Sequence, residues 1–305
     1  MRVHWDIYET PQTVEEALDR LAEYREEAAI IAGGTDLIVD LDQNDGFHQT
    51  LIDVSHISGL GQINTMGDEV SIGANVTLSD ILHAPAIRDL CPYLVGAIET
   101  IGSVQIRNIA TLVGNIANAS PAADGVLPLL ALDSYLVLKS HRGERQVPLR
   151  TFFTGPGQTV SKPDELITEV RFEKPGSNSA GAFEKIGFRH AMAIAIVNAA
   201  AFVALEEGRV VEARIALGSV APTPVLASDA EQFLLRTSLQ ERDVKRASEL
   251  VQRACSPIDD VRSGAEYRKK MVKTLTFRVL TRIREQFDSR QGRNRTPDFE
   301  GDFYE

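Results

Sequence analysis

The sequence predicts an α+β protein built from two unequal domains. The first observation is a short β-α-β pattern over about residues 1–55, and the second is a run of further strands and helices as far as about residue 172. The third is a change of texture in the second half, where two apolar runs are followed by three helical stretches. Strands and helices that occur in separate blocks are typical of the α+β class.

The opening unit is predicted from one capping sequence and two apolar runs. Thr13-Val14-Glu15-Glu16 has the pattern of a helix capping box and leads into apolar residues at helical spacing. Residues 28–32 form a short apolar run that ends at Gly33-Gly34, as a buried strand entering a turn would. Residues 51–54 predict a second strand.

The middle of the chain is expected to hold both strands and helices. Apolar residues alternate with polar ones over residues 70–76, which predicts a strand with one buried face. Thr77-Leu78-Ser79-Asp80 caps a helix that we expect to run to about Leu90, and a second helix is expected over 93–101. Strands are also expected over 134–139 and 165–172, and the polar stretch 173–179 is the best candidate for a linker.

The second half predicts a small antiparallel sheet followed by helices. Residues 194–205 and 210–217 are apolar runs separated by Glu206-Glu207-Gly208-Arg209, the pattern of a hairpin. Helices are expected over about 229–236, 239–255 and 265–287. Residues 288–305 are polar and lack periodicity, so we expect a flexible tail.

The composition is that of a globular protein and argues against several classes. The net charge of -11, from 32 basic and 43 acidic residues, disfavours a nucleic-acid surface. The N-terminus has no apolar h-region and no run of about 18 apolar residues occurs, so we expect no signal peptide, no membrane span and a cytoplasmic location. Cys91 and Cys255 are interpreted as buried or incidental thiols, and two cysteines cannot hold an iron–sulfur cluster, which takes about four.

The segment TIGSVQIRNIATLVGNIANASPAAD, residues 100–124, is the most informative part of the chain. It combines glycines and small residues with Asn108, Asn115 and Asn118 and with apolar anchors. Such a segment suits a chain that must approach a phosphate-bearing cofactor closely. The alternative is a long connection whose asparagines adopt left-handed turns, although loops of this length in a compact domain are usually functional.

A second motif, AIIAGGTD at residues 29–36, ends a strand in two glycines and a threonine. Its backbone N–H groups and one hydroxyl can bind a pyrophosphate without any cationic side chain, although Gly-Gly after a strand is also an ordinary tight turn. The spacing is neither that of a dinucleotide-binding GxGxxG motif nor that of a Walker loop. Residues 183–194 place Lys185, Arg189 and His190 before an apolar strand, which is either a functional cluster or a solvated edge.

The sequence offers no internal machinery for hydrolysis or nucleophilic catalysis. The six histidines are scattered, no group of His, Cys, Asp and Glu has metal-ligand spacing, and no GxSxG elbow occurs. We therefore expect no catalytic residue and no metal ligand in the chain, and a borrowed cofactor that carries the chemistry.

Together, AGGTDL at residues 32–37 and the segment 100–124 resemble the two FAD-binding motifs of a known family. The family is the flavoprotein (medium) subunit of the molybdenum hydroxylases, which include xanthine, carbon monoxide and nicotinate dehydrogenases and 4-hydroxybenzoyl-CoA reductase. Residues 256–280 resemble the closing helical segment of the same subunit, so the resemblance covers nearly the whole chain.

The resemblance implies an FAD-binding domain of the vanillyl-alcohol-oxidase (PCMH) type in two subdomains over residues 1–175, then a smaller α+β domain over 180–287. The FAD would be non-covalent. Backbone amides of residues 29–36 would hold its pyrophosphate, Ile101 would pack on a ring, Thr111, Gly114 and Asn115 would wrap the diphosphate and ribitol, and Asp124 would bind a polar group. The implied cofactor-binding residues are Ala29, Ile30, Ile31, Ala32, Gly33, Gly34, Thr35, Asp36, Ile101, Thr111, Gly114, Asn115, Asp124, Ile167 and Lys185.

The chain departs from the family pattern at three places. Val113 stands where the motif often has glycine, and a positive φ there would strain a β-branched residue. His190-Ala191-Met192-Ala193 stands where members often carry an acidic residue near the flavin. The four-cysteine insertion of 4-hydroxybenzoyl-CoA reductase is missing.

The function implied by the resemblance is electron relay. A large molybdenum-cofactor partner would oxidise the substrate, and a small [2Fe–2S] partner would pass the electrons to the FAD held here and on to NAD, O₂ or another acceptor. The alternatives are a free-standing FAD-binding flavoprotein and an independent FAD oxidase of the same fold. Gly33→Val or Gly34→Val is expected to abolish FAD retention because a Cβ would occupy the space of the pyrophosphate.

Overall fold

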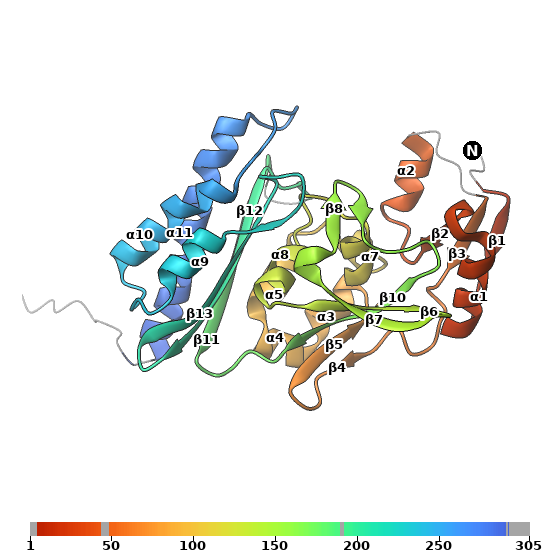
Figure 1. Ribbon diagram of the computed structural model, residues 1–305, viewed down its shortest axis with the longest axis horizontal. Coiled ribbons are helices and arrows are strands. Elements are labelled where there is room, and N and C mark those ends of the chain that lie inside the picture. The colour runs from red at the N-terminus through yellow and green to blue at the C-terminus, as the bar shows by residue number, and fades with distance from the viewer. Residues whose placement is uncertain (1–4, 44–48, 190–191, 291, 293–305) are drawn as a thin grey trace, which may run out of the picture.

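The computed structural model describes residues 5–43, 49–189, 192–290 and 292. The chain forms a small N-terminal subdomain, a middle subdomain and a C-terminal sheet that carries helices on its outer face (Figure 1). The strands gather in sheets of three, five, four and two members. Helices and strands both contribute, so the predicted α+β class is confirmed.

The N-terminal subdomain is a parallel sheet in the order β1-β3-β2, formed by β1 (Ile7–Glu9), β2 (Ala28–Ile31) and β3 (Thr50–Asp53). The crossovers are α1 (Val14–Tyr24) with a 3-10 turn, η1 (Arg25–Glu27), and α2 (Leu37–Gln43). The Thr13 hydroxyl accepts a hydrogen bond from the Glu16 amide at 3.1 Å, whereas the Glu16 carboxylate accepts from the Gln12 amide. The predicted helix and both predicted strands are therefore present, and β1 and α2 are additional.

The middle subdomain is built on an antiparallel sheet in the order β4-β5-β10-β6-β7. Its strands are β4 (Ile63–Asn64), β5 (Glu69–Gly73), β6 (Tyr135–Ser140), β7 (Gly143–Pro148) and β10 (Leu166–Glu173). A 3-10 turn, η2 (Leu149–Thr151), leads to a separate pair, β8 (Phe153–Gly155) and β9 (Gln158–Thr159). The sequence predicted β5, β6 and β10. It missed β7, because that strand is largely exposed and carries no apolar alternation.

Short helices pack over this sheet: α3 (Leu78–His83), α4 (Pro85–Leu90), α5 (Pro92–Glu99), α6 (Val104–Arg107), α7 (Leu112–Ala117) and α8 (Val126–Ala131). The capping box at Thr77 is confirmed by reciprocal bonds with Asp80. The single helix expected from Thr77 to Leu90 is wrong, because Pro85 has no N–H to continue α3 and instead occupies the first turn of α4. The segment 100–124 is likewise not an irregular loop, since α6 and α7 lie within it.

The C-terminal sheet has the order β11-β12-β13-β14 and is antiparallel throughout. Its strands are β11 (Ser179–Ile186), β12 (Val197–Glu206), β13 (Arg209–Gly218) and β14 (Val225–Leu226). The predicted hairpin is confirmed: Glu207 and Gly208 both have positive φ, 50° and 75°, as a two-residue type I′ turn requires.

Helices cover the outer face of this sheet, namely α9 (Ser228–Leu234), α10 (Glu241–Leu250) with the 3-10 turn η3 (Val251–Ala254), and α11 (Ala265–Arg290) (Figure 1). The inner face packs on α5 and α8, and Phe202 joins the core of the middle subdomain. The tail predicted from residue 288 is wrong for its first three residues, which end α11. Residues 293–305 lie outside the described residues. Among the described helices, none has both the length and the apolar composition that crossing a membrane requires.

Candidate functional site

A cavity of about 960 Å³ lies where the three parts of the chain meet. Its walls come from the turn after β2, from the segment 100–124, and from C-terminal residues that include Met192, Ser219 and Arg268. Ligand pockets commonly measure about 300–1,000 Å³, so this cavity suits a large ligand.

The two glycine-containing motifs touch each other through their backbones. A Cβ on Gly33 would lie 2.0 Å from the carbonyl oxygen of Ile109, so only glycine allows this approach. Gly34 has a φ of +67°, and a Cβ there would meet the side chains of Ile31 and Ile38. From the sequence, both glycines were expected to leave space for the pyrophosphate. The structure gives a different reason for them. Each is required by the protein's own backbone, and together they make the motifs one continuous wall.

The turn after β2 presents hydrogen-bond donors that have no partner among the described residues. Within the described ranges, the amide N–H groups of Gly33, Gly34 and Thr35 donate no hydrogen bond, and all three residues line the cavity. Successive free N–H groups of this kind bind phosphate oxygens. Burial, and secondarily the charge of Asp40, raises the pKa of the adjacent Asp36 carboxyl, so this acidic group is more readily neutralised than an ordinary aspartate.

The second motif is held by a helix cap of its own and by a backbone hydrogen bond from α3. The Thr111 hydroxyl accepts a hydrogen bond from the Gly114 amide at 2.9 Å, and the Ala110 carbonyl accepts one from the Leu78 amide at 2.8 Å. Val113 lies inside α7, is 5% exposed, and has no positive φ. The strain considered for Val113 is therefore absent, because a helical backbone accommodates a β-branched residue.

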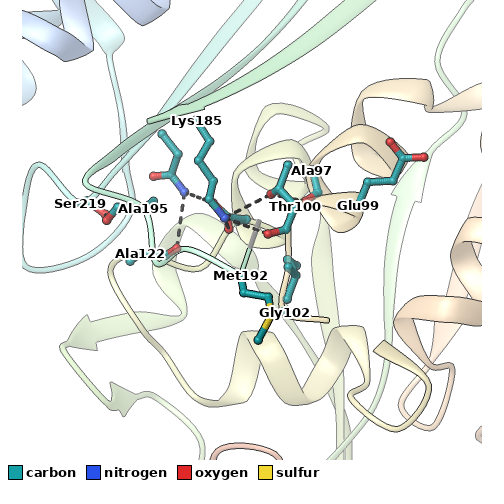
Figure 2. A network of polar contacts seen from close by, with 12 residues as sticks. Ala97, Glu99, Thr100, Gly102, Ala122, Lys185, Met192, Ala195 and Ser219 are labelled. Atoms are coloured by element: carbon teal, nitrogen blue, oxygen red, sulfur yellow. Dashed lines mark hydrogen bonds and ion pairs between the residues drawn. The ribbon is translucent and has the colours of Figure 1, made fainter. Parts of the chain in front are cut away.

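Asp124 and Lys185 form a buried bridge between the two domains. The Lys185 side chain reaches from β11 to Thr100 in the segment 100–124 (Figure 2). One Asp124 oxygen accepts from Lys185 Nζ at 2.5 Å, and the other accepts from the Asn198 amide at 2.7 Å. Lys185 also donates to the Thr100 carbonyl at 3.0 Å. Burial raises the pKa of the Asp124 carboxyl, while the Lys185 ammonium and the Asn198 amide stabilise the carboxylate and offset part of that rise. Asp124 thus fastens the C-terminal sheet to the segment 100–124.

Most of the residues expected from the sequence are brought together. Of the fifteen, only Ala29 and Lys185 do not line the cavity: Ala29 packs on the small cluster around Leu41 and Leu51, and Lys185 lies behind the wall on Asp124. Of the basic cluster at 183–194, Arg189 is exposed and donates to the Met192 carbonyl, and His190 lies outside the described residues.

Sequence reasoning missed the contribution of α11 to the cavity. Arg268 is only 3% exposed and donates to the carbonyls of Ile196 and Ser219 at 3.1 and 2.9 Å, and to Asp260 at 2.6 Å. The only available signal was a cation at the start of an otherwise regular helix, which is normally a solvated position. The partners that bury it come from distant strands and loops.

Residues 2–174 match the family described as the FAD binding domain in molybdopterin dehydrogenase. The chain belongs to this family. Residues 182–283 match the CO dehydrogenase flavoprotein C-terminal domain. The domain class and the cofactor expected from the resemblance are thereby confirmed.

Individual relatives align over nearly the whole chain. A putative xanthine dehydrogenase FAD-binding subunit of Escherichia coli is 32% identical over 276 residues, which cover 90% of this chain and 94% of the relative. The nicotinate dehydrogenase FAD-subunit of Eubacterium barkeri is 31% identical over 283 residues, 91% of this chain and 96% of its own. A solved structure of carbon monoxide dehydrogenase from Hydrogenophaga pseudoflava superposes with a TM-score of 0.90 at 29% identity, covering 94% of this chain and 99% of the matched chain.

The residues of the cavity fit the family's cofactor. FAD carries a diphosphate and two flat ring systems, and the cavity offers free amides in one turn together with aliphatic walls such as Ile101 and Ile167. Within these complexes the molybdenum and iron–sulfur cofactors belong to other subunits. The chain is accordingly the FAD subunit of an oxidoreductase of the molybdenum hydroxylase type.

Proposed function

We propose that this chain is the electron-transfer subunit of a molybdenum-dependent hydroxylase or dehydrogenase complex. Bound FAD would supply the redox chemistry, taking electrons from a [2Fe–2S] partner subunit and giving them to NAD, O₂ or another acceptor. A large molybdenum-cofactor subunit would oxidise the substrate. The names of the relatives, which are FAD or medium subunits, support this assembly. We retain a cytoplasmic location as part of the proposal.

The observation that carries the proposal is one cavity walled by both motifs and closed by loops of the C-terminal domain together with Arg268 of α11. The amides of Gly33, Gly34 and Thr35 would bind the diphosphate oxygens. Thr111, Gly114 and Asn115 would line the path of the diphosphate and ribitol, and Ile101 and Ile167 would pack on the rings. The chain's task in this scheme is to hold, orient and desolvate the cofactor rather than to move a proton itself.

The bridge between Asp124 and Lys185 assigns a role to two residues that were expected to contact the cofactor directly. Because both Asp124 oxygens already have partners from the C-terminal sheet, we propose that Asp124 shapes the cavity by fixing the sheet in place. Lys185 would then act as a positioning residue, since it reaches the cavity wall only through Asp124 and Thr100.

The test is purification from the native source without a tag on this chain. We expect a large molybdenum subunit and a small iron–sulfur subunit to co-purify with it. The Gly33→Ala variant should retain both partners and substrate-dependent reduction of the iron–sulfur centres, yet lose reduction of the external acceptor. A chain that purifies alone with FAD and full turnover of a small substrate would instead establish the alternative, an independent FAD oxidase; FAD binding without turnover would establish a free-standing flavoprotein.

A further inference from the structure

A second cavity of about 840 Å³ runs along β11, on the far side of the Lys185–Asp124 bridge from the first. One wall is α5, with Pro92, Tyr93 and Gly96, and the other is α11, with Arg282 and Gln286. Its floor is β11 itself, residues 181–186. We call this cavity the β11 groove.

The floor of the groove is the free edge of a sheet. β11 is the first strand in the order β11-β12-β13-β14, so among the described strands it has a neighbour on one side only. Residues of an antiparallel pair alternate between those bonded to the partner strand and those turned away from it. The carbonyls of Asn178 and Ile186 accept from Leu205 and Ile196 on the β12 side, so the odd-numbered residues of β11 direct their N–H and C=O groups outward into the groove.

Only the beginning of this edge is protected. Arg290 donates to the Ser179 carbonyl at 2.7 Å, and Gln286 donates to the Gly181 carbonyl at 3.1 Å. Further along, the backbone N–H and C=O groups of Phe183 and Lys185 have no hydrogen-bond partner anywhere in the described chain. Edge strands are usually blunted by a proline, a bulge or a covering element. This half of β11 has no proline and no bulge, and no described segment hydrogen-bonds to its outer side.

The spacing of the unpaired groups indicates the kind of ligand that fits. Equivalent groups on alternate residues of a strand recur about every 6.7 Å, which matches the backbone of another strand. A partner strand of this kind satisfies donors and acceptors together, whereas a small molecule would have to reproduce that repeat. The exposed end of the groove carries Phe188, which is 72% exposed, and the cation Arg189.

The two walls also specify the side chains of such a strand. The α5 wall is apolar, and a Cβ on Gly96 would meet nothing within 4 Å, so there is open space above it. The α11 wall is polar, with Arg282 paired to Glu184 at 2.6 Å and 56% exposed. Successive side chains of a strand point to opposite faces, so the ligand would alternate apolar residues toward α5 with acidic or amide residues toward Arg282.

We propose that the β11 groove receives an extended segment of a partner subunit, which adds a strand to the edge of the C-terminal sheet. This inference rests on the proposed function, because it requires the chain to work in a complex. It selects a partner subunit because Arg189, a cation at the exposed end of the groove, complements an acidic residue and because the relatives are themselves subunits. Main-chain hydrogen bonds between β11 and the added strand would supply the affinity. The α5 and α11 walls, which contact its side chains, would supply the specificity.

The experiment compares backbone amide exchange of residues 181–187 in the isolated full-length chain and in the assembled complex. We expect the Phe183 and Lys185 amides to exchange about 100-fold more slowly in the complex, since each would then donate to a neighbouring strand. Gly96→Leu should fill the groove and weaken assembly about tenfold while FAD content stays unchanged. Gly61→Leu is the matched control, because a Cβ at that exposed position before β4 also meets nothing within 4 Å.

Four outcomes overturn the inference. Unchanged exchange at Phe183 and Lys185 on assembly would leave the groove without a partner strand. Protection already present in the isolated chain and lost on deleting residues 291–305 would assign the groove to the chain's own terminus. Protection that rises with concentration of the isolated chain would assign it to a second copy. Assembly of Gly96→Leu equal to that of Gly61→Leu would exclude the groove from the interface. If no complex forms at all while FAD is retained, the proposed function fails first, and the two failures are thereby distinguished.

Discussion

Gly33→Ala tests whether the two motifs form one wall by direct backbone contact. A Cβ at this position would lie 2.0 Å from the Ile109 carbonyl oxygen, 2.6 Å from its carbonyl carbon and 3.0 Å from the Ala110 Cα. Ordinary van der Waals contact begins at 3.4 Å, so the two backbones would have to separate by 3.4 − 2.0 = 1.4 Å. All three atoms belong to the main chain, and none can rotate away as a side chain would.

The magnitude follows from the kind of atom that must move. Overpacking a well-packed site costs about 1–3 kcal/mol, and a rigid backbone contact places Gly33→Ala near the upper end, at about 3 kcal/mol. If the penalty of about 3 kcal/mol destabilises the conformation that binds FAD, the affinity for FAD falls roughly 100-fold.

Two measurements separate the effects on binding and on folding. The ratio of flavin to protein absorbance after gel filtration reports FAD retention, and urea unfolding of the FAD-free protein followed by circular dichroism reports stability. Gly61→Ala is the control, because its Cβ meets nothing within 4 Å, and we expect a change within about 0.5 kcal/mol. A Gly33→Ala protein with the flavin content and urea midpoint of the wild type would refute the backbone-contact argument.

Three further predictions follow from buried groups around the cavity. Val113→Gly introduces the glycine that the resemblance led us to expect at this position. The substitution should destabilise the protein by about 2–3 kcal/mol without improving FAD retention, because Val113 is a core residue in a helix; tighter FAD binding would contradict this. Lys185→Met should lower the free energy of urea unfolding by about 3 kcal/mol because it leaves the Asp124 carboxylate buried without its cation. The double variant Lys185→Met/Asp124→Asn should recover part of this loss. If the effects of the two substitutions are strictly additive, the bridge makes no contribution. Burial raises the pKa of Glu165, but hydrogen bonds from Arg145 and a backbone amide outweigh burial and leave the folded-state pKa lowered. The ionised Glu165 carboxylate therefore stabilises the fold above the unfolded pKa of about 4.3, and this contribution is lost as the pH falls through the folded-state pKa. Glu165→Gln should therefore cost about 1–2 kcal/mol at neutral pH, after allowance for solvent around Arg145, and less below about pH 4; a difference that grows on acidification would contradict the assignment.

The elements that the sequence predicted well are those whose signal is local. The helix after Thr13 depends on a capping residue and an apolar stripe, and the hairpin at Glu207-Gly208 depends on a turn that only certain residues adopt. Errors arose where local signal was weak or interrupted. The apolar periodicity on both sides of Pro85 predicted one continuous helix, but Pro85 divides it in two. β7 has too few apolar residues to be distinguished from a loop.

The candidate site divides in the same way. Thirteen of the fifteen expected residues line the cavity. Twelve of the thirteen lie in two contiguous motifs whose composition already indicated close approach to a cofactor, and the other, Ile167, lies in β10. Arg268 and Asn198 could not be identified, since nothing near them in sequence distinguishes them from ordinary helix and strand residues. Their roles come from partners that lie 49 and 74 residues away, at Ser219 and Asp124 respectively.

The sequence by itself determined the class of fold, the two FAD motifs and the family, because each depends on short-range composition and order along the chain. Only the tertiary structure decided why Gly33 must be glycine, that Asp124 and Lys185 satisfy each other across a domain boundary, and that no described strand pairs with the outer edge of β11. Those three properties depend on distances between segments that are remote in sequence. Such distances are fixed only when the apolar faces of the separate sheets and helices pack into a common core.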